Sequence, residues 1–323
     1  MGALFPRTSS FDAELHGIAA ALRQEREAWR ARQQRSDIAR FPLPGEVADA
    51  VEHISAALYP FRLGGVRGAV RGTESHEDAF VADQLRQGLS ILKEQVAAEL
   101  DYWQSESAHP FEPDQAETIV RHFATTLPEV RALIDSDIEA AFLGDPAAKS
   151  AFEILVSYPG AQAILHHRLA HELHKLGAVI VARIVSALAN ARTGIDIHPG
   201  AAIGPRFFID HGTGVVIGET AVVGADVKLY QHVTLGARSA LGVAEVSARE
   251  RFARHPIVED DVVIYAGATI LGRVTIGRGS VIGGNVWLLE DVPPGSVVTQ
   301  PEAVRLNDEA ARGVAETLTG RAG

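Results

Sequence analysis

The sequence contains no cysteine in its 323 residues. Disulfide bonds, zinc–thiolate sites and cysteine nucleophiles are therefore excluded. Positive charge is also in short supply, because 30 Lys and Arg face 41 Asp and Glu and give a net charge of −11. No dense basic patch occurs along the chain, which argues against a nucleic-acid partner.

Long hydrophobic runs are missing as well. The most apolar stretch, Leu176–Ala189, is too short to span a bilayer and carries Arg183 in its middle. The start of the chain lacks the charged and then apolar pattern of a secretory signal. We therefore expect a cytoplasmic protein without a membrane partner.

The most regular feature that is present is an aliphatic residue at every sixth position between Ile195 and Val298. The longest unbroken series of these residues comprises Val258, Ile264, Ile270, Ile276, Ile282 and Leu288. Two shorter series precede it, Ile197, Ile203, Ile209 and then Ile217, Val223, Leu229, Leu235. A six-residue period fits neither a helix nor an alternating strand. It is typical of a solenoid in which each hexad forms a strand and a corner, and three hexads close one triangular coil.

The first ~190 residues follow helical periods instead. Apolar residues recur at helical spacing in Val47–Leu58, Leu85–Leu100 and Val130–Ile138. Five prolines are expected to end helices: Pro60, Pro110, Pro113, Pro128 and Pro159. We therefore predict an α+β protein with an α-helical domain at 1–193, a β-solenoid domain at 194–300 and a C-terminal tail at 301–323.

The repeat is interrupted once at length, by an inserted loop at 236–257. Insertions in solenoids emerge on one face and are often where ligands bind. This one carries five basic residues, including Arg254 and His255. Its composition is compatible with an anionic ligand nearby or with a solvent-exposed loop that binds no ligand.

Polar residues crowd into the first coils, as Asp196, His198, Asp210, His211, Glu219 and His232. His211 stands at a break in the period, because Ile209 to Ile217 spans eight residues rather than six. Asp196 precedes His211 by 15 residues, nearly one coil, so the two can lie on adjacent rungs. A carboxylate that holds one imidazole nitrogen leaves the other free to act as general base.

The chain offers no obvious nucleophile of its own, so we expect His211 to activate a hydroxyl group of the substrate. Metal binding is the competing hypothesis for the histidines, since His198, His211, His232 and His255 could meet across subunits. The solenoid lacks closely spaced ligand pairs, however, and the segment His171–His174 is one residue short of an H-E-x-x-H motif. We therefore predict no metal.

Several longer motifs occur in and around the solenoid. They are Gly194-Ile-Asp-Ile-His-Pro-Gly-Ala, Ile209-Asp-His-Gly-Thr-Gly-Val-Val-Ile-Gly-Glu-Thr-Ala, Val233-Thr-Leu-Gly, Gly144-Asp-Pro-Ala, Tyr158-Pro-Gly-Ala and Arg254-His-Pro-Ile. Together they resemble the serine O-acetyltransferases, which belong to the hexapeptide-repeat acyltransferases. The resemblance covers roughly residues 140–300. The first ~135 residues resemble the longer N-terminal helical region of one subgroup.

The resemblance implies a left-handed parallel β-helix. It also implies transfer of an acetyl group from acetyl-CoA to the hydroxyl of L-serine, which gives O-acetylserine for cysteine synthesis. The implied catalytic residues are His211 as base and Asp196 as its partner. The implied ligands of serine are Asp145 and Asp210 for the ammonium group and Arg254 and His255 for the carboxylate. The implied backbone contacts to acetyl-CoA are Gly236, Ala237, Ala266 and Gly284.

The resemblance further implies inhibition by cysteine at the serine site. A three-sided prism has flat faces, so we expect a homotrimer, or a hexamer of paired trimers, with sites between subunits. Many relatives dock the sulfhydrylase through a C-terminal isoleucine. This chain ends in Arg321-Ala-Gly, so we do not expect that complex.

Two alternative functions are compatible with the repeat. An acetyltransferase acting on a sugar or another small acceptor would have the same hexads, but a neutral sugar does not need the charged Asp145, Arg254 and His255. A scaffold protein that has lost catalysis would not need the pair Asp196 and His211.

Overall fold

The computed structural model describes residues 10–32, 40–63, 74–104, 110–238 and 252–301. The chain divides into two compact units, Met1–Phe41 and Pro42–Gly323. The described part of the first unit is one helix, α1 (Ser10–Arg32). This helix was not predicted from the sequence, although Phe11, Leu15, Ile18 and Leu22 recur at helical spacing along it and are all exposed.

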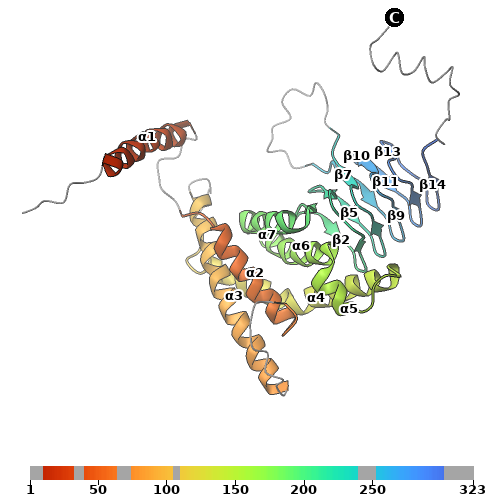
Figure 1. Cartoon of the computed structure of the whole chain (residues 1–323), viewed down its shortest axis with the longest axis horizontal. Helices are drawn as coiled ribbons and strands as arrows, with labels where there is room; N and C mark the ends of the chain where they lie inside the picture. The colour runs from red at the N-terminus through yellow and green to blue at the C-terminus, as the bar shows by residue number, and fades with distance from the viewer. Residues whose placement is uncertain (1–9, 33–39, 64–73, 105–109, 239–251, 302–323) are drawn as a thin grey trace, which may run out of the picture. The chain divides into compact units, whose positions relative to one another are not determined.

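The second unit begins with helices that pack on one another and on the first β-coils (Figure 1). They are α2 (Pro44–Leu58), α3 (Glu74–Trp103), α4 (Gln115–Gly144), α5 (Ala151–Ser157), α6 (Pro159–Lys175) and α7 (Val179–Thr193). The three helices expected from apolar spacing are confirmed as parts of α2, α3 and α4. Their buried side chains form one hydrophobic cluster with those of α6 and α7.

Pro128 lies inside α4 and does not end it, so that prediction was wrong. Proline removes one backbone donor and crowds the preceding turn, which usually breaks a helix. Apolar residues on both sides of Pro128 (Phe123, Leu127, Val130 and Ile134) are buried in the hydrophobic cluster, so tertiary packing favours a continuous helix.

After Thr193 the chain winds into short parallel strands (Figure 1). The strands are β1 (Asp196–Ile197), β2 (Ala202–Ile203), β3 (Phe208–Ile209), β4 (Val216–Ile217), β5 (Val222–Val223), β6 (Lys228–Leu229), β7 (Thr234–Gly236), β8 (Ile257–Val258), β9 (Val263–Ile264), β10 (Thr269–Leu271), β11 (Thr275–Ile276), β12 (Val281–Ile282), β13 (Trp287–Leu288) and β14 (Val297–Val298). Each belongs to one of three parallel sheets, so the fold is the predicted left-handed parallel β-helix.

The three sheets are the walls of a triangular prism. The first sheet has the order β1-β4-β7-β10-β13, the second β2-β5-β8-β11 and the third β3-β6-β9-β12-β14. The aliphatic residue of each hexad is paired in register with its counterpart in the next coil, as Ile197 is with Ile217. Most of these side chains are almost fully buried and form a second hydrophobic cluster inside the prism, which confirms the role assigned to the repeat.

Two corners of the prism carry most of the polar residues of the first coils. The first corner comprises the turns that lead from the third sheet to the first, after β3, β6, β9 and β12. The second corner comprises the turns that lead from the first sheet to the second, after β1, β4, β7 and β10. The inserted loop leaves the prism at the second corner, after β7, and its residues 239–251 lie outside the described residues.

The helices are joined to the first coil by close packing and by a buried ion pair. Gly160 in α6 lies so near β3 that an added Cβ would be 2.2 Å from the carbonyl oxygen of Ile209. Arg168 in α6 pairs with Asp137 in α4 through two hydrogen bonds of 3.0 and 3.1 Å. Both side chains are at most 5% exposed.

The same pair also bonds to the backbone of the first coil. Arg168 donates to the carbonyl oxygens of Ile203 and Gly204, and Asp137 accepts from the amide of Phe207 at 2.8 Å. Burial raises the pKa of Asp137 to about 6, which leaves the carboxylate ionised at neutral pH. Two helices and the turn before β3 are therefore held by one charged pair.

We predict that Asp137→Ala lowers the free energy of unfolding by about 3–5 kcal/mol, because Arg168 would stay buried without its counter-charge. Chemical denaturation measures this change. The control is Glu52→Ala, which breaks the exposed pair of Glu52 with Arg192 and should cost less than about 1 kcal/mol. Equal losses in the two variants would contradict a special role for the buried pair.

Candidate active site

His211 lies at the first corner, in the turn between β3 and β4. This turn is longer than the one after β6, since Ile209 to Ile217 spans eight residues and Leu229 to Leu235 spans six. The extra length is accommodated by positive φ angles, 58° at His211 and 89° at Gly212. The side chain of His211 is 73% exposed. The break in the period therefore places an imidazole clear of the wall, as predicted.

Two carboxylates flank this imidazole. An oxygen of Asp210 lies 3.9 Å from His211 Nε2. Asp145, the residue that caps the C-terminal end of α4, is near enough to feel the charge of His211. The site therefore joins the end of a helix to the turn after a strand.

Asp145 is held by two donors. The hydroxyl of Tyr158 donates to it at 2.6 Å and the amide of Ala147 at 2.8 Å. These bonds, with smaller contributions from Lys228 and His211, lower the pKa of Asp145. The bond to Asp145 in turn raises the pKa of Tyr158 to about 12. Asp145 is therefore a fixed anion and Tyr158 a fixed donor at neutral pH.

Lys228 completes the group at the first corner, and the sequence analysis did not identify it. Its ammonium nitrogen lies 3.1 Å from Asp210 and 3.0 Å from the carbonyl oxygen of Gly144. It also lies 4.6 and 4.7 Å from the ring centres of Phe208 and Tyr230. Charged residues are common at outward strand positions of a solenoid. The position of Lys228 in its hexad therefore did not identify it as a site residue.

Asp196 lies on β1, half-buried. Among the described residues, no bond joins its carboxylate to His211, whose recorded ion pair is with Asp210. The turn that carries His211 nevertheless sits on the segment just before Asp196. The amide of Gly214 donates to the carbonyl oxygen of Gly194 at 2.8 Å, and Gly212 packs on Ile195. The role of Asp196 as partner of His211 stays a prediction.

Arg254 and His255 lie at the second corner. Arg254 pairs with Glu219 at 2.6 Å, and His255 Nδ1 accepts the amide hydrogen of Thr220 at 3.1 Å. His255 packs directly over Gly218, where an added Cβ would lie 2.0 Å from its ring. This contact explains why the turn after β4 needs a glycine.

Burial lowers the pKa of His255, and the nearby Arg254 and Arg273 add to the effect. His198, at the same corner two coils earlier, has its pKa lowered to about 4, first by burial and then by Arg183. Both imidazoles are therefore neutral at physiological pH. In the described part of the chain, no three His, Asp or Glu side chains are grouped as ligands for a metal ion.

The predicted serine ligands thus fall into two groups within one chain. Asp145 and Asp210 lie with His211 at the first corner, before the strands of the first sheet. Arg254 and His255 lie at the second corner, beyond the ends of those strands. This separation was not predicted from the sequence.

The four residues assigned to acetyl-CoA are divided in the same way. Ala266 and Gly284 are neighbours at the first corner, where an added Cβ on Gly284 would lie 3.2 Å from the carbonyl oxygen of Ala266. They are in the coils beyond the one that carries His211. Gly236 and Ala237 lie at the second corner, where Gly236 ends β7.

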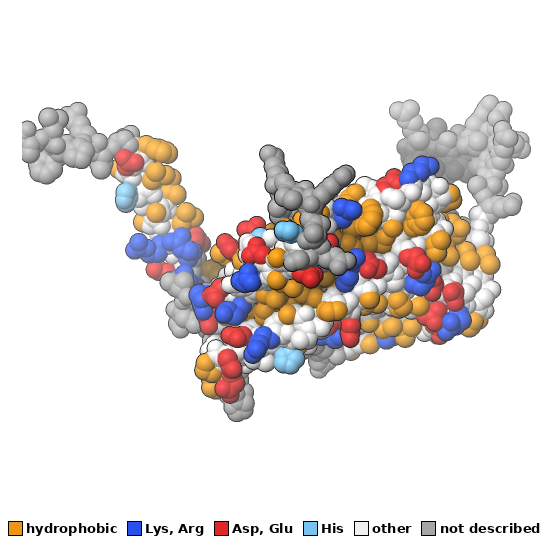
Figure 2. All heavy atoms as spheres, turned by 90° about the horizontal axis from the view of Figure 1, so that it is seen from below, with side chains coloured by type: hydrophobic (Ala, Val, Ile, Leu, Met, Phe, Trp, Pro, Cys, Tyr) orange, Lys and Arg blue, Asp and Glu red, His pale blue; other side chains and the backbone are white. Residues whose placement is uncertain are grey.

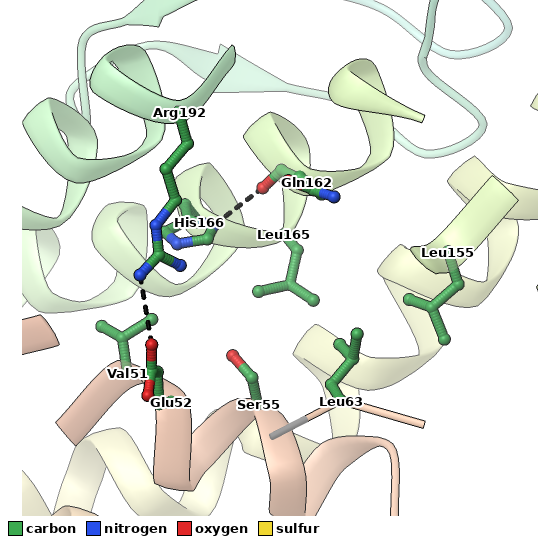
Figure 3. Close-up of a pocket in the computed structure, with 9 residues that line it drawn as sticks. All are labelled: Val51, Glu52, Ser55, Leu63, Leu155, Gln162, Leu165, His166 and Arg192. Carbon is green, nitrogen blue, oxygen red and sulfur yellow. Dashed lines mark hydrogen bonds and ion pairs between the residues drawn. The ribbon is translucent and has the colours of Figure 1, made fainter. Parts of the chain in front are cut away.

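A separate pocket of about 340 Å³ opens among α2, α5, α6 and α7 (Figure 3). Its lining includes His166, whose Nδ1 donates to the carbonyl oxygen of Gln162 at 2.7 Å, and Arg192, which pairs with Glu52. None of the residues predicted to bind serine or acetyl-CoA lines it. This pocket is therefore distinct from the candidate site.

The surface agrees with the charge pattern of the sequence. Figure 2 shows Lys and Arg side chains interspersed with Asp and Glu on this face of the unit that begins at Pro42. No described helix is long and apolar enough to cross a membrane.

Comparisons with known proteins show the family of this chain. The family model for bacterial transferase hexapeptide (six repeats) matches residues 255–289. A plasmid-encoded serine acetyltransferase of Synechococcus elongatus is 47% identical over 283 residues, which are 85% of this chain and 87% of that protein.

Two solved structures extend the comparison. Serine acetyltransferase isoform 3 of Entamoeba histolytica, in complex with cysteine, has a TM-score of 0.67 and 31% identity, covering 92% of this chain and 99% of that one. Serine acetyltransferase of Neisseria gonorrhoeae, in complex with serine, has a TM-score of 0.51 and 27% identity, covering 80% and 96%. By its repeat, its site motifs and this similarity along most of its length, the chain belongs to the serine acetyltransferase family.

Proposed function

We propose that this chain transfers the acetyl group of acetyl-CoA to the hydroxyl of L-serine, with His211 as general base. The observation that carries the proposal is an exposed imidazole beside two carboxylates, Asp210 and Asp145. An amino acid substrate needs anionic contacts for its ammonium group close to the base that meets its hydroxyl. The solved relatives that hold serine or cysteine support an amino acid ligand.

His211 would take the proton of the serine hydroxyl as the oxygen attacks the thioester carbon. It would then return that proton to the departing thiol sulfur, so that the imidazole is neutral again after each turnover. Asp196 would hold the second ring nitrogen and fix the tautomer. This step requires the exposed ring of His211 to turn from Asp210 toward Asp196.

Asp145 and Asp210 would bind the ammonium group of serine, and Arg254 with His255 would bind its carboxylate. Arg254 offers a charged donor for that group. His255 is held in one orientation by Thr220, so it too would present a fixed ring. Cysteine has the same two charged ends as serine, so it should compete for the same contacts.

Acetyl-CoA would supply the activated acetyl group, and the corner residues fit such a ligand. Ala266 and Gly284 have no side chain beyond Cβ, which leaves backbone groups accessible along the corner that carries His211. Gly236 and Ala237 are equally small at the second corner. A long ligand in contact with both pairs would lie between the first corner of one prism and the second corner of another.

The separation of the two corners also supports a trimer. One chain presents the base and the carboxylates at one edge of its first sheet, and Arg254 and His255 at the other edge. Cyclic symmetry would bring the first corner of one subunit against the second corner of the next and complete three equivalent sites. The outward row of the first sheet includes Val216 and Trp287, which are 38% and 66% exposed and are suited to burial there.

We predict that His211→Asn retains the fold and loses serine acetylation by about 10²–10⁴-fold, the usual effect of removing a positioned base. Asparagine is chosen because it tolerates the positive φ at this position. The assay is release of CoA from acetyl-CoA in the presence of L-serine, sugars or no acceptor.

His232→Asn is the matched control, because His232 is at the same corner one coil later and has a φ of 59°. It should stay within a few fold of the parent. If His211→Asn also acetylates serine at nearly the parental rate, His211 is not the base. Transfer to sugars but not to serine would refute the proposed substrate.

A second prediction concerns the shared site. His211→Asn and Arg254→Ala should each be inactive alone. In an equal mixture with exchanged subunits, a site has both groups when an Arg254→Ala subunit supplies His211 and the adjacent His211→Asn subunit supplies Arg254. Each condition holds for half of the subunits. About a quarter of the parental activity should return.

The mixture must be unfolded and refolded together, and separately refolded samples serve as controls. A fully active monomer in sedimentation would contradict the trimer. Trimers that regain no activity on mixing would show that both groups act within one subunit.

A further inference from the structure

We propose that Lys228 is a specificity-determining residue whose ammonium group occupies the binding place of the substrate's ammonium group until an amino acid displaces it. This inference rests on the proposed function of the site. The new element is that the ammonium group of Lys228 competes with the substrate for Asp145 and Asp210. Any ligand of these carboxylates must therefore displace Lys228.

The contacts of Lys228 are those that the ammonium group of an amino acid would need. Its nitrogen lies 3.1 Å from a carboxylate oxygen of Asp210 and 3.0 Å from the carbonyl oxygen of Gly144. The ring of Tyr230 lies beside the same nitrogen, with its centre 4.7 Å from it. An ammonium group has three donors, and Lys228 directs two of them at a carboxylate and a carbonyl group of this site.

The position of Lys228 also brings its charge near the second carboxylate. Gly144, which accepts one of its bonds, directly precedes Asp145 in the chain. The positive charge of Lys228 contributes to the ionisation of Asp145. Lys228 therefore lies with both of the carboxylates that are proposed to receive serine, and neutralises one of their two charges.

The side chain can leave this place without unfolding the coil. Lys228 projects outward from β6, and it is 20% exposed. The rings of Phe208 and Tyr230, 4.6 and 4.7 Å from its nitrogen, offer further favourable contacts to a cation. A lysine stem has four rotatable bonds, so the ammonium group can swing away while the strand stays paired.

Displacement of Lys228 has a consequence for selectivity. A ligand without an ammonium group cannot replace the bonds that Lys228 gives up, so it should not enter. A ligand with an ammonium group binds, but more weakly than it would to two free carboxylates. The same competition should help to release the product, because O-acetylserine has the same ammonium group.

The alternative is that Lys228 only holds Asp210 in place. The two possibilities predict opposite changes when the ammonium group is removed. Without a competitor, serine should bind more tightly. Without a support for Asp210, serine should bind more weakly.

The test is Lys228→Met, which keeps most of the apolar stem and removes the charge. We expect the KM for serine and the inhibition constant of cysteine to fall together, by about tenfold, the lower end of the effect of a hydrogen bond to a charged group. The KM for serine should change more than the kcat, because Lys228 does not touch the reacting atoms. Lys228→Arg, which keeps the charge, should resemble the parent.

Lys175→Met is the matched control, since Lys175 is an exposed lysine paired with Glu172. It should change none of these values. A weaker or unchanged affinity for serine in Lys228→Met overturns the proposal, even when the parent acetylates serine normally.

Calorimetry with L-serine and L-cysteine separates this result from failure of the proposed function. Tighter amino acid binding by Lys228→Met supports the displacement, whatever the rate of acetylation. If the parent binds neither amino acid, the proposed function and this inference both fail. If Lys228→Met does not fold, Lys228→Gln is used with the same criteria.

Discussion

The buried ion pair between Arg168 and Asp137 connects the two architectures of this chain. Isolated charges are costly to bury, and this pair is tolerated because each partner also bonds to the backbone of the first coil. The bonds fix α4 and α6 against the turn before β3. Asp145 caps the end of α4 and Tyr158 immediately precedes α6, so the helical part of the active site depends on this joint. A β-helix alone would present His211 and Asp210 without the second carboxylate.

The geometry of the prism sets a second constraint. Residues of successive coils stack along a corner, and the width of the first sheet separates one corner from the next. His211 and Arg254 lie on opposite sides of the first sheet, in the turns before and after its strands. A neighbouring subunit removes this separation without any change in the fold, because a corner of one copy can face a different corner of another. The proposed trimer is therefore a consequence of where the charged groups lie.

The repeat could be predicted from the sequence because each hexad has an inward aliphatic side chain at the same position. His211 could be found because it breaks that period. Lys228 could not, because a charge at an outward strand position is ordinary in any coil. The role of Asp145 was inferred from resemblance alone, since it lies on a helix outside the repeat and no spacing relates it to His211. The prediction for Pro128 was wrong because tertiary packing of the helix on both sides of it outweighs the local rule.

The two corners share an electrostatic arrangement that bears on assembly. At the first corner the carboxylate of Asp210 is neutralised by Lys228, and at the second the guanidinium of Arg254 is neutralised by Glu219. Each half of the proposed site therefore contains a group of the same charge as the part of serine that it would receive. Paired charges are less costly to bury than single ones. In the proposed trimer, subunits could then associate before a substrate arrives, and an amino acid with both charged ends would replace both internal partners at once. A ligand with only one charged end would leave the other pair in place, so selection for an amino acid arises from the pairing itself.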